Sequence, residues 1–243
     1  MATMRRRFRE LAADQRAITG LETAIILIAF VIVASVFAYT VLTAGIFASQ
    51  KANESVNAAV DEVLSSIVVG GNTIAFTGAV DIDGDTATDD TVDAVVRISL
   101  TLAVALQGTP IDLTPAYRLS TSTLDLEASG LVNSLAITYI DKDQVISNMA
   151  WTVDFGETSD GDYSLESTEK ATVTVWLVDH PYDATTGLYY KLGEGPGDPF
   201  LDAKEALLGS YDAFSLEISP VQGAPLSVEK VIPQSLNPIM NLR

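Results

Sequence analysis

The residues from Leu21 to Lys51 read LETAIILIAFVIVASVFAYTVLTAGIFASQK, with 28 uncharged residues between Glu22 and Lys51. About 20 apolar residues are enough for a helix to cross the hydrocarbon core of a bilayer. The stretch therefore predicts a long apolar helix near the N-terminus, with more hydrophobic length than a single bilayer requires.

A basic segment precedes this helix, with five arginines in the first seventeen positions: Arg5, Arg6, Arg7, Arg9 and Arg16. The positive-inside tendency keeps that side in the cytoplasm and places the rest of the chain outside. The remaining nine basic and thirty acidic residues give a net charge of −21, which argues against nucleic acid as a partner. The chain has no cysteine, so disulfides and thiolate metal sites are excluded.

Hydropathy alone leaves several interpretations of the N-terminal segment open. A secretory signal has a shorter apolar core followed by a small-residue cleavage site, which this stretch does not match. A permanent single-span anchor fits the length. Against the anchor stands Glu22 at the start of the span, because an unpaired carboxylate in hydrocarbon costs several kcal/mol.

Residues 16–42 read RAITGLETAIILIAFVIVASVFAYTVL. This run resembles the start of archaellins, the archaeal flagellins, and of related archaeal type IV pilin-like proteins with a class III signal peptide. The resemblance implies that a basic leader, residues 1–17, is removed by a membrane-embedded prepilin peptidase that cuts between Ala17 and Ile18. The family more often has glycine where this chain has Ala17.

Two further positions match the family's leader pattern, the basic Arg16 before the cut and Gly20 at the third mature position. Glu22 matches the acidic residue at the fifth mature position, which the family uses to register subunits during assembly. The cut frees an α-amine on Ile18, which can neutralise the Glu22 carboxylate within one helix or between subunits. Such a pair is tolerable in a dry filament core where either charge alone is not.

The same resemblance implies the function, the partners and the location. We expect a structural subunit of an archaellum, a motility filament outside the cell, held before assembly as a precursor in the cytoplasmic membrane. The expected partners are further copies of the chain, other archaellins, the prepilin peptidase, and an assembly platform with its ATPase. The alternatives are an adhesive pilin of the same superfamily and a single-span membrane-anchored surface protein that binds a ligand.

The second half of the N-terminal helix is predicted to be amphipathic. Apolar residues recur there at helical spacing with polar residues between them: Val56, Val60, Val63, Leu64 and Ile67. Gly70 and Gly71 are expected to end the helix. The mature helix is therefore predicted to span residues 18–70.

Residues 72–243 are predicted to form a β-rich head domain. Positions 96–106 alternate apolar and other residues, the pattern of a strand with one buried face. Shorter runs of the same kind occur at residues 151–155, 172–178 and 214–218, separated by turn clusters. The expected fold is α+β, a long helix followed by an antiparallel β-sandwich of broadly Ig-like architecture.

No catalytic constellation is recognisable in the sequence, so we expect no enzyme activity. His180 is the only histidine, and we expect it to be solvated in a loop. Asp81, Asp83 and Asp85 alternate around Gly84 and are candidate Ca²⁺ ligands, because carboxylates suit that ion. The spacing is not that of an EF-hand, so the pattern favours an acidic solvated hairpin and no cofactor.

One sequon for N-glycosylation is present, Asn53-Glu54-Ser55. It falls on the predicted helix close to the membrane surface. Asn53 is therefore a candidate glycosylation site in an unfavourable position.

Overall fold

The computed structural model divides into two compact units, residues 1–58 and residues 59–243. The structure describes no side chains for residues 2–19, 61–64 and 188. The described backbone comprises residues 2–64, 66–83, 90–105, 109–156, 160–185, 187–195 and 197–242.

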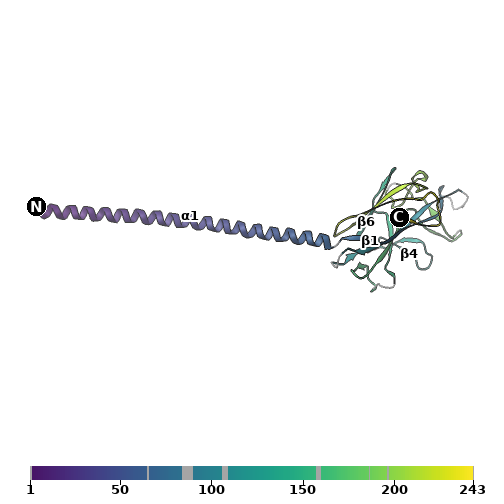
Figure 1. Ribbon diagram of the computed structural model, residues 1–243, viewed down its shortest axis with the longest axis horizontal. Coiled ribbons are helices and arrows are strands. Elements are labelled where there is room, and N and C mark those ends of the chain that lie inside the picture. Colours follow the sequence, from purple (N-terminus) through teal and green to yellow (C-terminus); the bar gives the residue numbers. More distant parts are fainter. Residues whose placement is uncertain are drawn as a thin grey trace. The chain divides into compact units, whose positions relative to one another are not determined.

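The N-terminal unit is helical, because residues 2–58 belong to one helix, α1, which is Ala2–Leu64 and is drawn purple to blue in Figure 1. The sequence of this segment contains no proline, so no residue interrupts the backbone hydrogen-bond ladder. Hydroxyl groups in its apolar part bond back to the carbonyls of the preceding turn. Ser35 Oγ donates to the Val31 carbonyl at 2.6 Å, and Thr40 Oγ1 donates to the Phe37 carbonyl at 2.8 Å. Their polar groups are thus satisfied without water.

The predicted end of the helix is wrong. α1 ends at Leu64, and Gly70 and Gly71 lie inside strand β1, Ile67–Asp81. The β-branched run that opens β1 favours a strand, and the ladder to the neighbouring strand shifts register between Val69 and Thr73. The β-domain therefore begins at about Ile67 and not at residue 72.

The two glycines serve close packing inside the sheet. A Cβ on Gly70 would lie 2.8 Å from the Ala103 Cβ, and one on Gly71 would lie 2.9 Å from the Thr101 Cβ. Both distances are shorter than side-chain contacts allow. Glycine at these positions lets the two strands approach at the irregularity.

The larger sheet has the strand order β13-β1-β2-β10-β8, and β16 also pairs with β1. All these pairs are antiparallel except that between β1 and β13. Besides β1, its members are β2 Thr91–Val104, β8 Ala150–Asp154, β10 Ala171–Trp176, β13 Tyr190–Lys191 and β16 Ile239–Leu242.

The second sheet is antiparallel and has the order β15-β14-β6-β7. Its strands are β6 Leu135–Asp141, β7 Val145–Ile146, β14 Ala213–Pro220 and β15 Leu226–Val231. Three short pairs lie outside the two sheets: β3 Ile111–Asp112 with β9 Ser164–Leu165, β4 Tyr117–Leu119 with β5 Leu126–Ala128, and β11 Tyr182–Asp183 with β12 Gly187–Leu188. A 3-10 helix, η2, covers Lys204–Ala206.

One hydrophobic core joins the two sheets. The alternation predicted for the strand at 96–106 is confirmed, since Ile98, Leu100 and Leu102 of β2 are fully buried. Leu106 lies outside the described residues. The same core includes inward-facing residues of the second sheet, such as Tyr139 of β6 and Leu216 of β14. A helix followed by antiparallel sheets that share a core confirms the predicted α+β class.

Candidate functional site

The candidate site is the apolar surface of α1. Every side chain from Gly20 to Val60 is exposed, including large apolar ones. Phe30 is 72% exposed, Phe37 69% and Tyr39 71%. This segment is also long and apolar enough to cross a membrane. So much apolar surface in water is unfavourable, at roughly 25 cal/mol per Å², and requires an apolar cover.

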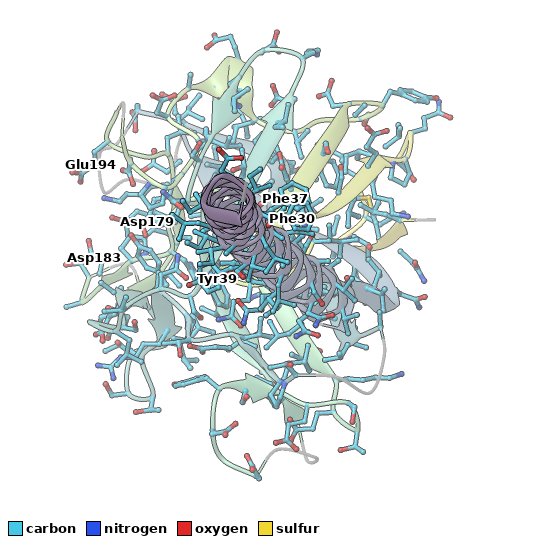
Figure 2. All side chains as sticks on the ribbon, turned by 90° about the vertical axis from the view of Figure 1, so that its left-hand side faces the viewer. Phe30, Phe37, Tyr39, Asp179, Asp183 and Glu194 are labelled. Atoms are coloured by element: carbon cyan, nitrogen blue, oxygen red, sulfur yellow. The ribbon has the colours of Figure 1, made fainter. Side chains whose placement is uncertain are left out.

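The apolar side chains surround the helix on all sides. Residues advance by about 100° each, so Phe30 and Phe37 share a side while Tyr39 lies about half a turn away from Phe30. Figure 2, viewed along the helix, shows Phe30 and Phe37 on one side and Tyr39 on the other. A helix that is apolar all round suits only surroundings that are apolar all round, either hydrocarbon or a bundle of helices.

Polar residues return after Phe47, and the helix becomes amphipathic. Lys51 Nζ and Glu54 Oε2 form an exposed ion pair at 2.8 Å on one side. Val56 and Val60, on a different side, are 60% and 48% exposed. Of the predicted apolar stripe, Val56 and Val60 therefore lie in α1, the side chains of Val63 and Leu64 lie outside the described part, and Ile67 lies in β1.

The residues assigned to processing and registration all lie in α1. Arg16, Ala17 and Ile18 have helical backbone, and their side chains lie outside the described part. Glu22 is exposed, and a Cβ on Gly20 would meet nothing within 4 Å. Packing inside this chain therefore does not require glycine at residue 20. Recognition of Gly20 by a separate protein, the peptidase, stays a prediction.

The candidate calcium ligands are not all in the described part. Asp81 is buried, at 4% exposure, and its Oδ1 accepts the Asp83 backbone N–H at 3.2 Å. Asp85 lies outside the described residues. Within the described ranges no three His, Cys, Asp or Glu residues are placed to hold a metal. Binding of Ca²⁺ stays a prediction, as does glycosylation of Asn53, which lies exposed in α1.

His180 is not solvated as predicted, but lies half-buried in an aromatic stack on the larger sheet. Its ring is stacked 4.4 Å from Tyr190 and 5.7 Å from Trp176. His180 Nδ1 lies 3.0 Å from the Tyr189 carbonyl oxygen, and burial lowers the pKa of the imidazole. The stack continues to Arg97, whose guanidinium lies 5.1 Å from the Trp176 ring and 4.6 Å from the Phe76 ring.

This aromatic stack was missed from the sequence. Its partners come from β1, β2, β10 and β13, of which β1 and β2 are far from His180 along the chain. The available signal was Trp176 at the end of a strand four residues before the lone histidine. Its buried indole, with Nε1 donating to Thr152 Oγ1 at 3.1 Å, indicates a structural role in the sheet.

Known proteins match this chain over nearly its whole length. Residues 17–230 match the family model for archaeal-type flagellin. The chain is similar to "Probable flagellin 1" of Archaeoglobus fulgidus, with 31% identity over 94% of this chain and 96% of that protein. It is also similar to "Probable flagellin 1" of Aeropyrum pernix, with 29% identity over 91% of this chain and 94% of that protein.

A solved structure has the same fold. The archaeal flagellum of Methanospirillum hungatei strain JF1 aligns with a TM-score of 0.51 and 20% identity. The alignment covers 92% of this chain and 98% of that chain. The long helix followed by antiparallel sheets is therefore an architecture already seen in a solved structure.

Proposed function

The chain belongs to the archaeal-type flagellin family, and we propose from that premise that it is a structural subunit of an archaellum filament. In this proposal the subunits polymerise through α1 and the filament serves motility outside the cell. The observation that carries the proposal is the helix from Gly20 to Val60, apolar on all sides in its first part and exposed throughout.

Two environments in turn satisfy such a helix. A membrane covers it while the subunit is stored as a precursor in the cytoplasmic membrane. In the filament, copies of the same helix replace the lipid, and branched and aromatic side chains fill the gaps between backbones. The partner is therefore chiefly the chain itself, with other archaellins as further components of the same filament.

Removal of the leader makes it possible for the helix to leave the lipid and pack against other copies in the filament. We assign the cut to a prepilin peptidase acting between Ala17 and Ile18, with Arg16 and Gly20 as part of its recognition sequence. The cut removes the five leader arginines, which favour the cytoplasmic side. It also frees the Ile18 amine to neutralise Glu22, which registers one subunit against the next. The resemblance of residues 16–42 to the start of archaellins supports this assignment.

Extraction from the membrane requires work from outside the chain. The proposal includes an assembly platform with its ATPase as transient partners. It assigns the acidic head to solubility on the outside of the filament and not to nucleic acid. A structural role of this kind requires no catalytic site.

N-terminal sequencing of chains from shed filaments tests the proposal. A start at Ile18 in chains recovered from filaments supports both processing and polymerisation. An intact Met1 on a chain that stays in the membrane, with no filaments, would show a membrane-anchored surface protein instead. Loss of swimming after deletion of the gene, with surface attachment unchanged, separates a motility filament from an adhesive pilus.

A further inference from the structure

We propose that a bilayer covers only the first part of the apolar run, and that residues 44–50 are covered only by a neighbouring copy in the filament. Burial of this outer segment then favours the filament over the membrane pool. The inference rests on the proposed function, because it concerns the same helix in the same two environments.

The first step is a comparison of lengths. The 28 uncharged residues after Glu22 extend about 42 Å as a helix, whereas a hydrocarbon core is about 30 Å thick. At the average tilt of about 20°, the hydrocarbon accommodates about 32 Å of helix, or about 21 residues. Counted from Thr23, this ends at Thr43. Counted from Ile18, it ends earlier still.

The second step is the chemistry of the part left over. Residues 44–50 include Ile46, 51% exposed, and Phe47, 67% exposed, and carry no charge. The ion pair of Lys51 and Glu54 follows at once, 66% and 70% exposed at the side chains. This pair opposes a deeper position of the helix in the membrane, since charged groups favour the aqueous side. With the span counted from Thr23, the two large apolar side chains stay at the polar surface in the membrane pool.

The third step identifies the cover in the filament. A bilayer has a fixed thickness, but a bundle of copies can cover each helix along its whole apolar length. The outer segment continues, without a break, the surface that the proposed function places against other copies. A second copy of α1 therefore buries Ile46 and Phe47. The apolar run is longer than the bilayer is thick, and assembly relieves this mismatch because it buries the residues that the bilayer leaves uncovered.

Cysteine labelling can test this directly, because the natural chain has no cysteine. Ile28 and Ile46 are a matched pair, since they are 18 residues apart and about five turns place them on the same side of the helix. They are also similarly exposed in the chain by itself, at 57% and 51%. Ile28→Cys and Ile46→Cys variants would be treated with a membrane-impermeant maleimide on the outer side.

The labelling is measured in two states, in membranes of cells that lack the assembly ATPase and in purified filaments. We expect Ile46→Cys to react at least tenfold faster than Ile28→Cys in the membrane pool. In filaments we expect both positions to be protected. Protection of Ile46→Cys in the membrane pool would overturn the inference, because lipid or the subunit's own head would then cover the outer segment.

Rapid labelling of Ile46→Cys in intact filaments would also overturn the inference, because no neighbouring copy would then cover residue 46. If the unmodified chain formed no filaments at all, the proposed function itself would fail, which is a distinguishable result.

Assembly gives a second measurement. We expect Ile46→Ser to keep its amount in the membrane and to lose at least tenfold in filament yield, with recovery in Ile46→Leu. A normal filament yield from Ile46→Ser would contradict the proposal that burial of residue 46 favours the filament.

Discussion

Replacing Phe30 by alanine should loosen the filament while leaving the head domain intact. Phe30 is 72% exposed in the single chain, so a bundle of copies would remove most of its surface from water. Full burial of a large apolar side chain contributes about 1.5–3 kcal/mol, which makes the transfer part here about 1–2 kcal/mol. The cavity left by truncation adds to this, and Phe→Ala changes in packed cores cost about 3–5 kcal/mol.

A loss of about 3 kcal/mol per subunit has a large effect on assembly. Because about 1.4 kcal/mol corresponds to a factor of ten, the subunit concentration in equilibrium with the filament rises on the order of 100-fold. The assay is stepwise heating of purified, sheared filaments, followed by pelleting and measurement of the chain left in solution. Phe30→Ala filaments should release subunits at a lower temperature than the unmodified ones.

A matched control separates helix packing from a general effect of removing an aromatic side chain. Tyr163 lies in the head domain and is 44% exposed, so Tyr163→Ala should leave the release temperature unchanged. If Phe30→Ala and unmodified filaments released subunits at the same temperature, the view that α1 is covered by other copies would be refuted. A lower release temperature in both variants would refute the assignment of the effect to α1.

Glu22→Ala should spare leader removal, seen as an unchanged N-terminus, but reduce filament yield; normal filaments would contradict the registration role. Gly45→Ala adds a Cβ that meets nothing within 4 Å in this chain and removes a helix-interior glycine that costs about 1 kcal/mol. We therefore expect a more stable isolated helix but less thermostable filaments, and unchanged filament melting would show that no neighbour approaches there. Trp176→Ala should destabilise the head by about 3–5 kcal/mol, since the side chain is 1% exposed and supports Arg97. Denaturant unfolding followed by the fluorescence of the remaining Trp151 measures this, and an unchanged midpoint would contradict the packing role. Burial lowers the pKa of His180 below its ordinary 6.5, so the folded state binds the proton less readily than the unfolded state. Stability should therefore fall as the pH drops through about 6.5, and the drop in melting temperature between pH 7.5 and 5.5 should be smaller in His180→Phe.

Patterns that depend on near neighbours in the sequence were predicted correctly. The 28-residue uncharged run decides the helix by itself, and the alternation in β2 follows from one face of that strand packing in the core. The processing residues depend on a resemblance and not on such patterns. Their roles follow from the family and cannot be obtained from hydropathy or spacing.

The errors share a physical cause, which is contact between distant segments. A pair of glycines after an amphipathic helix is also what a helix end looks like. What fixes Gly70 and Gly71 in a strand is the approach of Thr101 and Ala103, about thirty residues away along the chain. Likewise His180 is buried because β13, parallel to β1, brings Tyr190 against its ring.

The position of β1 between two partners has a mechanical consequence. This strand is joined to α1 by two residues, and it is paired with β2 along Ile67–Asp81 and with the C-terminal strand β16 along Thr73–Phe76. A pull transmitted from the helix along the direction of β1 loads these ladders in shear, so many hydrogen bonds resist together and none is peeled off first. A swimming filament subjects its subunits to drag, and the strand next to the helix is held by β2 from Ile67 and, on its other side, by β16 from Thr73.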